Sequence, residues 1–461
     1  MDKIIINARV ATETDVFEAD IGIRDGKIAA YSHHMPLEGA ETIDAKGRLV
    51  VPGVIDAHTH MDFPFMGTTS ADDFGSGTVA AACGGTTAII DFILPKQSQS
   101  LLEALHDYRS RADPLVAVDY GLHMIFKQEN LSELESIPQL VKEGIPSFKL
   151  FMTYRKEGLM LDDKSLFKVM QKVGQTHGLV AIHAENNGII ENLVETNLDA
   201  GNFSARYHAL SKPSLAEAEA VGRAALLAHA ASVRSYIVHL SSAYGAEAIE
   251  YAQSKGYDIF AETCPHYLVL TDEVYDRPDG GNFVMSPPLR SKRDCASLWD
   301  GIRSGSIQTI GSDHCPFNSQ QKDYGKGDFT KIPNGVPGTE TILPLMFSEG
   351  VRKNRITIFD MVRVTSSNPA RRFGLYPRKG CLIIGADADL AIIDTSKRVR
   401  LAADKLHTNI DYSVYDHITT EGYPILVMSR GRTVMDNGEF VGKKGTGEFL
   451  PRELEADITF K

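Results

Sequence analysis

The chain has 461 residues, and its composition excludes several classes of protein before any motif is considered. Hydrophobic residues make up 43% of it and charged residues 23%, with 39 Gly and 20 Pro, so neither a disordered chain nor a fibrous repeat is indicated. The net charge of −12 leaves no basic surface for nucleic acid, and no partner of that kind is expected. The length suits one large α/β barrel with an accessory domain.

The cysteines and the apolar runs indicate the compartment. The five cysteines are scattered, odd in number and without C-x-x-C spacing, which argues against a disulfide framework and against a structural zinc knot. The first apolar stretch, Ile4-Ile5-Ile6, is short, and no later run approaches the roughly 20 residues needed to cross a bilayer. We therefore expect a cytoplasmic protein with no membrane partner.

The N-terminal segment predicts short β-strands. Residues 3–50 alternate apolar and polar side chains and contain the tight-turn pair Asp25-Gly26, which is typical of a hairpin. Residues 1–51 are accordingly assigned to a small β domain.

The central part of the chain, residues 52–375, predicts a parallel barrel. Short apolar runs alternate there with amphipathic stretches such as Leu101-Arg111, Leu215-Ala231 and Gly245-Lys255, the pattern of repeated β-α units. The predicted strands are Leu49-Ile55, Thr87-Phe92, Val116-Phe126, Ser147-Met152, Leu179-His183, Ser235-His239, Asp258-Thr263 and Ile307-Gly311. Eight such units match an α/β fold of the (β/α)8, TIM-like type. A doubly wound open sheet is the alternative, but the chain lacks a G-x-G-x-x-G turn after its first strand.

The C-terminal segment again predicts strands. Residues 376–445 contain short alternating runs and the turn pair Asn437-Gly438, so we expect them to complete a β-sandwich with the N-terminal strands. Residues 446–461, with Pro451 and mixed charges, predict a tail that is ordered only if it docks on another surface.

Two histidines at the end of the first barrel strand suggest a metal site. In a strand, side chains two residues apart point to the same side, so His58 and His60 can bind one metal ion together. Alone this signal is weak, because two such histidines on an exposed strand are more often simply solvated.

Further candidate ligands stand at the ends of later strands. Lys149 lies within the fourth predicted strand, His183 and His239 end the fifth and sixth, and Asp313 follows the last one. Catalytic groups of such barrels lie at the C-terminal ends of the strands, so these side chains are expected to ring one mouth. Four imidazoles and one carboxylate suit Zn²⁺, with Mn²⁺ or Co²⁺ as alternatives, and are too many for one tetrahedral catalytic ion. Two metal ions per chain are therefore expected.

Lys149 needs a modification to act as a ligand. An ammonium group has no acceptor, but a neutral lysine nitrogen can react with CO2 to form a carbamate (N6-carboxylysine), whose two oxygens can bridge two cations. Neighbouring cations favour the neutral amine by depressing its pKa. The alternative is an ordinary lysine at the barrel mouth, paired with an acid.

Taken together, the motifs resemble one enzyme family. The motifs are His58-Thr59-His60, Phe148-Lys149-Leu150-Phe151-Met152-Thr153-Tyr154, His183-Ala184-Glu185-Asn186, Ser286-Pro287-Pro288-Leu289-Arg290 and Gly311-Ser312-Asp313-His314. In this order they resemble the dihydropyrimidinase and hydantoinase branch of the cyclic amidohydrolases, over nearly the whole chain.

The resemblance implies a ligand set and a reaction. It implies two zinc ions, one held by His58, His60, carbamylated Lys149 and Asp313, the other by Lys149, His183 and His239. A hydroxide bridging the ions would open the cyclic amide of a dihydropyrimidine or a 5-substituted hydantoin, giving an N-carbamoyl amino acid. Asp313 would take the proton of the attacking water and pass it to the leaving nitrogen.

The resemblance also implies the substrate contacts and an assembly. The hydroxyl of Tyr154 would bind the developing oxyanion, and the main chains of Ser286 and Asn334 would hold the ring imide of the cyclic ureide. Relatives of this kind are commonly homotetramers or dimers, so a homo-oligomer is expected.

The segment after the first ligands suggests which ring is preferred. Asp62 stands where dihydroorotases place an arginine, so a carboxylate here would repel an acidic ring. A hydrophobic wall for the substituent on the ring is expected from Met61, Phe63, Phe65, Leu94 and Phe151.

Two alternative functions stay open. An allantoinase would use the same metal ligands on a polar ureide. A non-catalytic assembly protein on the same fold is disfavoured, because none of the expected ligands is missing.

The remaining candidate residues are expected to have supporting roles or no role in the reaction. His123 is predicted to be an interior histidine, Glu185 to support His183 from behind, and His314 to orient Asp313 or to support its loop. Cys315 is not expected to act as a nucleophile, because a metal-activated hydroxide would make one redundant.

Overall fold

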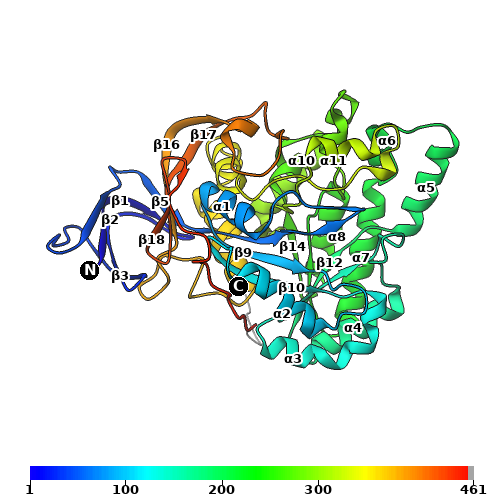
Figure 1. Ribbon diagram of the computed structural model, residues 1–461, viewed down its shortest axis with the longest axis horizontal. Coiled ribbons are helices and arrows are strands. Elements are labelled where there is room, and N and C mark those ends of the chain that lie inside the picture. The colour runs from blue at the N-terminus through cyan, green and yellow to red at the C-terminus, as the bar shows by residue number, and fades with distance from the viewer. Residues whose placement is uncertain (455–461) are drawn as a thin grey trace.

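The structure is a computed structural model that describes residues 1–454, and it has two parts: a barrel and a separate sheet (Figure 1). Eight parallel strands form the barrel sheet in the order β15-β14-β13-β12-β11-β10-β9-β6. Their bounds are β6 (Val54–Thr59), β9 (Thr86–Ile93), β10 (Asp119–Ile125), β11 (Ser147–Phe151), β12 (Leu179–His183), β13 (Arg234–Ile237), β14 (Ile259–Thr263) and β15 (Thr309–Ile310).

The barrel is nearly closed, since a parallel bridge between Thr59 and His314 links its two edges. The predicted eight-stranded barrel is thereby confirmed, and the open doubly wound sheet is wrong.

Helices connect the strands and cover the barrel. The longer ones are α1 (Phe74–Gly84), α2 (Leu101–Ala112), α4 (Asp163–Gly174), α5 (Asn187–Asp199), α7 (Ser214–Ala230), α8 (Ala243–Ser254) and α10 (Lys292–Ser304). The three helices predicted from periodicity agree with α2, α7 and α8 to within two residues at each end. Among the described residues, no helix combines the length and the apolar character that a bilayer crossing requires.

The first predicted strand is in fact two strands. Leu49–Pro52 (β5) pairs with strands of the terminal sheet, whereas β6 begins at Val54 and belongs to the barrel. The chain changes sheets at Gly53, where a Cβ atom would lie 2.1 Å from Thr87 Oγ1. A single strand over Leu49-Ile55 is therefore wrong, because the continuous apolar pattern hides the change of sheet.

Strands from both ends of the chain form the second sheet. It has nine strands in the order β19-β18-β17-β16-β5-β1-β2-β3, with β4 paired to β1. Their bounds are β1 (Lys3–Ala11), β2 (Val16–Arg24), β3 (Lys27–Ser32), β4 (Glu41–Asp44), β5, β16 (Leu390–Arg400), β17 (Thr419–Ser429), β18 (Arg432–Asp436) and β19 (Glu439–Phe440). Both predicted hairpin turns are confirmed, since Arg24 pairs with Lys27 and Asp436 with Glu439.

One apolar cluster holds the strands of the two termini together. Ile5, Ile21 and Val50 from the N-terminal strands pack with Leu390 and Met428 from the C-terminal ones. The small β domain is therefore built jointly by both ends of the chain, as the flanking patterns predict.

The C-terminal tail docks on the barrel of its own chain. Gly447 donates a hydrogen bond to the carbonyl of Val116 (3.1 Å), and Tyr120 donates to that of Glu448 (2.9 Å). Arg452 is only 2% exposed and donates to the carbonyl of Leu122 and to Ser147 Oγ. These partners lie near the N-terminal ends of β10 and β11, so the tail covers the end of the barrel opposite the candidate ligands. The predicted tail extends to 461, and residues 455–461 lie outside the described residues.

Candidate metal centre

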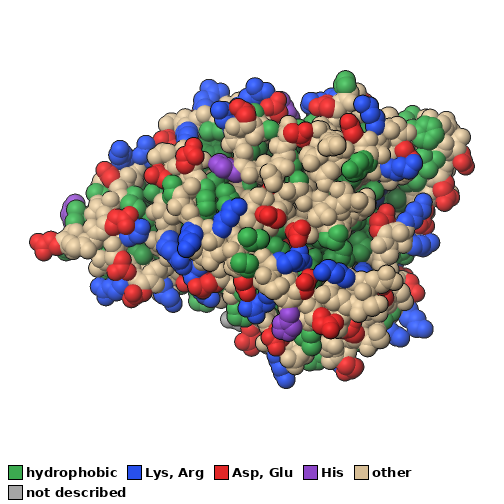
Figure 2. Space-filling view, in the orientation of Figure 1, with side chains coloured by type: hydrophobic (Ala, Val, Ile, Leu, Met, Phe, Trp, Pro, Cys, Tyr) green, Lys and Arg blue, Asp and Glu red, His purple; other side chains and the backbone are tan. Residues whose placement is uncertain are grey.

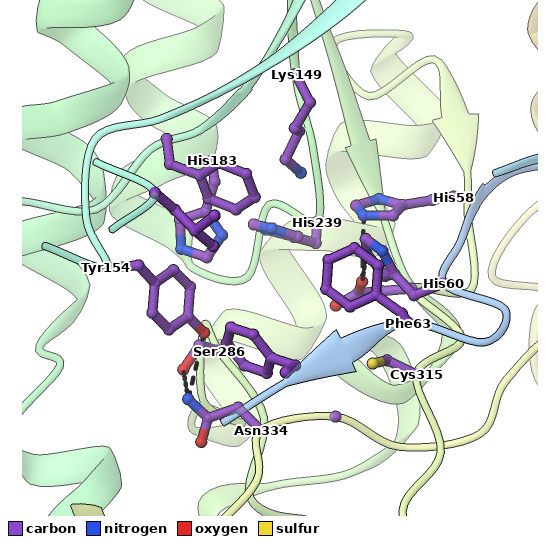
Figure 3. Close-up of a pocket in the computed structure, with 15 residues that line it drawn as sticks. His58, His60, Phe63, Lys149, Tyr154, His183, His239, Ser286, Cys315 and Asn334 are labelled. Atoms are coloured by element: carbon purple, nitrogen blue, oxygen red, sulfur yellow. Dashed lines mark hydrogen bonds and ion pairs between the residues drawn. The ribbon is translucent and has the colours of Figure 1, made fainter. Parts of the chain in front are cut away.

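A cavity at the C-terminal ends of the barrel strands holds the predicted ligands (Figure 3). It is lined by all six of them: His58, His60, Lys149, His183, His239 and Asp313. Tyr154, Ser286 and Asn334 line it as well. The structure thus brings together ligand candidates from five separate barrel strands, as the barrel topology predicts.

Two histidines and one carboxylate converge on one side of the cavity. His58 Nε2 lies 3.1 Å and His60 Nε2 lies 3.2 Å from the same oxygen of Asp313. Burial lowers the pKa of His60 to about 4, so this imidazole is neutral and keeps a free lone pair at pH 7. Burial acts to raise the pKa of Asp313, but its contacts with His58 and His60 outweigh that effect and the group stays ionised.

Lys149, His183 and His239 form the other side. The ring centroids of His183 and His239 lie 4.4 Å apart, and burial lowers the pKa of both imidazoles. Lys149 is 1% exposed, and its ammonium lies 4.9 Å from the ring centroid of Phe92. Among residues 1–454, no carboxylate lies within ion-pair distance of it, which excludes the ordinary paired lysine. Burial lowers the pKa of Lys149 to about 8, so a useful fraction of the amine is neutral at physiological pH.

The donor set fits divalent metal ions. His60 Nδ1 and His239 Nδ1 are buried nitrogens with no hydrogen-bond partner. Such orphaned polar atoms are uncommon in folded proteins and call for a ligand. Because neutral imidazoles and a carboxylate are the donors that zinc prefers, the residues fit the expected group.

A second carboxylate fixes the orientation of the first histidine. Glu262, at the C-terminal part of β14, lies 2.6 Å from His58 Nδ1 and accepts hydrogen bonds from the hydroxyl of Tyr236 (2.8 Å) and the main chain of His239 (3.0 Å). A carboxylate behind a histidine fixes its tautomer and raises its basicity as a ligand. Sequence reasoning missed Glu262, although an acidic residue within a buried strand was a signal that could have identified it.

We predict that Glu262→Gln weakens metal binding. The amide keeps the size of the side chain but removes the charge behind His58, which costs about 10- to 100-fold in metal affinity. Titration with a competing chelator measures this directly, and the exposed Glu247→Gln on α8 is the matched control. Equal affinities in the two variants would contradict the role given to Glu262.

Two other predicted supports lie near the ligands. Glu185 Oε2 lies 2.8 Å from His183 Nε2, as the i+2 spacing suggests. His314 contacts Asp72 through Nε2 (3.0 Å) and accepts from the main chain of Gly338 (3.1 Å), so it supports the loop and does not contact the Asp313 carboxylate. His123 is an interior histidine, with Nδ1 2.6 Å from Ser147 Oγ.

The residues predicted to hold the ring lie together at one end of the cavity. The side-chain amide of Asn334 donates to the hydroxyls of Tyr154 and Ser286, both at 3.2 Å. Burial raises the pKa of Tyr154 far above its usual value, so its hydroxyl keeps its proton and remains a donor. Gly335 has φ +148°, and a Cβ there would lie 2.3 Å from the carbonyl oxygen of Cys315, so this close approach requires glycine.

Aromatic side chains form the apolar wall, with two corrections. Phe63, Phe65 and Phe151 line the cavity as predicted, and Leu159 joins them. Met61 does not line it, because this residue follows His60 on the opposite side of the chain and packs toward α1, where its sulfur lies beside Gly77. Leu94 packs against the aromatic cluster from behind without lining the cavity.

Asp62 does not face the cavity. It forms an ion pair with Arg111 of α2, and it has no place in the cavity lining. The expected repulsion of acidic rings by this carboxylate is therefore wrong, because its charge is compensated on the outer side of the loop.

Comparison with known proteins places the chain among cyclic amide hydrolases. The sequence pattern of the Amidohydrolase family matches residues 49–434. A D-hydantoinase of Geobacillus stearothermophilus is 42% identical over 456 residues, which cover 98% of this chain and 97% of that protein. A D-hydantoinase of Ralstonia pickettii is 41% identical, covering 98% of this chain and 99% of its own length.

The fold is similar over its whole length to solved structures. The crystal structure of a dihydropyrimidinase from Brevibacillus agri NCHU1002 superposes with a TM-score of 0.95 at 42% identity. The match covers 98% of this chain and 99% of that one.

Proposed function

Because the chain belongs to the amidohydrolase family, in its hydantoinase and dihydropyrimidinase branch, we propose that it opens the cyclic amide of dihydropyrimidines or 5-substituted hydantoins to give N-carbamoyl amino acids. The observation that carries this proposal is the set of six ligand side chains around one cavity, next to a wall of aromatic residues.

The expected cofactors are two zinc ions. His58, His60 and Asp313 would hold one ion, His183 and His239 the other, and the carbamate of Lys149 would bridge them. When bound, such ions lower the pKa of a water molecule and polarise an amide carbonyl.

The side chains of the cavity have separate tasks in the reaction. The ionised carboxylate of Asp313 accepts a proton from the attacking water and returns it to the ring nitrogen as the C–N bond breaks. The protonated hydroxyl of Tyr154 donates to the carbonyl oxygen as negative charge develops there. The main chains of Ser286 and Asn334 align the imide of the ring.

The cavity favours a ring that carries an apolar substituent. Phe63, Phe65, Phe151 and Leu159 offer a substituent only apolar contacts. A polar ureide such as allantoin would leave its amide groups unpaired against this wall, which costs binding free energy. We therefore propose hydantoins with apolar substituents, and dihydropyrimidines, in preference to allantoin.

A substrate panel on metal-replete protein tests the proposal. We expect hydrolysis of phenylhydantoin and dihydrouracil to exceed that of allantoin, with about two zinc ions per chain by elemental analysis. Preference for allantoin would refute the substrate assignment. Fewer than one zinc per chain in active enzyme would refute the two-metal site.

We also propose that the enzyme self-associates through the outer helices. In the described part of the chain, seven of fourteen exposed large apolar residues lie between α5 and α8, and Figure 2 shows such side chains at the end of the molecule where α5 lies. They are Ile189, Phe203, Leu210, Leu215, Leu226, Tyr244 and Tyr251. Their concentration on neighbouring helices favours an interface there.

A charge placed on this surface should shift the assembly. We predict that Leu226→Glu lowers the mass in solution, measured by light scattering after size-exclusion chromatography, from a dimer or tetramer toward a monomer. Val441→Glu, at an exposed apolar position of the terminal sheet, is the control. A monomeric wild-type protein would contradict the assembly.

The five cysteines are all unpaired, which supports a cytoplasmic location.

A further inference from the structure

A buried lysine outside the metal centre has an unusual set of partners. Lys322, at the end of the short helix α11 (Ser319–Lys322), is 3% exposed. Its ammonium donates hydrogen bonds to three main-chain carbonyls: Val284 at 2.8 Å, Pro333 at 2.7 Å and Gly335 at 2.7 Å. Among residues 1–454, no carboxylate lies within ion-pair distance of it.

The three carbonyls belong to the two segments that line the imide end of the cavity. Val284 lies two residues before Ser286, and Pro333 and Gly335 flank Asn334 on both sides. The segments also contact each other, since Gly335 donates to the carbonyl of Val284 (3.0 Å) and the Asn334 amide to Ser286 Oγ. Lys322 therefore joins the two segments from the side away from the ring.

The number of partners matches the ammonium form. An ammonium has three N–H donors and no acceptor, whereas a neutral amine has two donors. Burial lowers the pKa of Lys322 to about 7, so burying its charge opposes folding, although the three carbonyl oxygens favour the ammonium form. An apolar side chain would avoid this cost. Stability alone therefore does not explain why a lysine occupies this position.

The neighbouring residue connects the same helix to the apolar wall. The side-chain amide of Gln321 donates to Thr68 Oγ1 (2.7 Å) and to the carbonyl of Thr69 (2.8 Å). These residues form β8 (Thr68–Thr69), which pairs with β7 (Pro64–Phe65), the strand that brings Phe65 to the cavity. Helix α11 thus contacts the imide end through Lys322 and the substituent end through Gln321.

We propose that Lys322 is a positioning residue for substrate: its ammonium holds the Ser286 and Asn334 segments at the spacing that the cyclic imide requires. This inference rests on the proposed function, because it takes Ser286 and Asn334 as the groups that hold the ring. Within residues 1–454, Lys322 lies outside the cavity lining, and its hydrogen bonds go to none of the proposed metal ligands. Its removal should therefore affect ring binding more than the chemical step.

The proposal is tested by comparing the steady-state kinetics of Lys322→Met with those of Lys326→Met. Lys326 is an exposed lysine four residues further along the chain, so its variant is the control. We expect KM for Lys322→Met to rise about tenfold, with kcat within about threefold of wild type and unchanged zinc content. The rise should be similar for dihydrouracil and phenylhydantoin, since both present the same imide. Gln321→Ala should instead raise KM mainly for phenylhydantoin, whose substituent needs the wall.

The outcomes separate this inference from the proposed function. A wild-type enzyme inactive on every ring refutes the function, whereas an active wild type with unchanged KM in folded, metal-replete Lys322→Met refutes the role of Lys322. If the methionine variant does not fold, Lys322→Arg replaces it. A guanidinium spreads its donors over three nitrogens and cannot direct them from one point. A raised KM in that variant supports the proposal, and an unchanged KM refutes it.

Discussion

Replacing Lys149 by alanine is expected to lower kcat/KM by at least about a thousandfold and to remove most of the bound metal. As the proposed carbamate, the buried Lys149 would supply an anion between the two groups of histidines. Without it, two dications would face each other with only Asp313 to compensate their charge. Elemental analysis and hydantoin hydrolysis measure the two losses.

Chemical rescue tests whether Lys149 carries the proposed carbamate. The space left by the side chain should admit a short carboxylic acid, whose two oxygens can replace the carbamate, so acetate or propionate should restore part of the activity of Lys149→Ala. The control is Lys142→Ala, an exposed lysine of α3 (Ile137–Lys142), which should match wild type with and without acid. The carbamate would be excluded if no acid restores activity and if mass spectrometry of the intact wild-type protein shows no added CO2.

Replacing Asp313 by asparagine is expected to lower kcat by about a thousandfold or more while KM changes by less than about threefold. The amide has nearly the same shape and can still contribute an oxygen near His58 and His60, but it cannot accept the proton of the attacking water. The proton transfer is therefore lost and the binding of the ring is kept. The comparison of kcat with KM on one hydantoin measures this separation.

The control for this variant is Asp323→Asn at an exposed position. Zinc content must be measured in parallel, because a fall in kcat that follows the loss of metal would assign Asp313 a ligand role only. Metal-replete Asp313→Asn with wild-type kcat would exclude the proton transfer altogether.

Sequence reasoning was most reliable where one local rule applies. The strand β12 begins and ends at the predicted residues, and both hairpin turns lie at the predicted dipeptides, because alternation and turn chemistry are properties of neighbouring residues. Sequence reasoning failed at Gly53, where a continuous apolar run passes from one sheet to another. It also failed for Met61, whose type fits an apolar wall but whose side chain points into the core.

The residues that sequence reasoning missed act through long-range contacts. Glu262 reaches His58 across 204 positions of the chain, and Lys322 reaches Val284 across 38. Neither has a spacing that distinguishes it from an ordinary charged residue. Asp62 shows the reverse case, since its charge suggested a role in specificity until its partner Arg111 was known.

The sequence alone determined the barrel, the domain built by both termini and the convergence of the candidate ligands. Apolar periodicity defines the strands, and parallel strands of a closed barrel necessarily bring their C-terminal ends to one rim. Only the tertiary structure decided which side chains face the cavity, which carboxylate supports His58, and how Lys322 joins the two segments at the imide end. Those features depend on which distant groups meet each side chain, and burial then determines its charge and its partners.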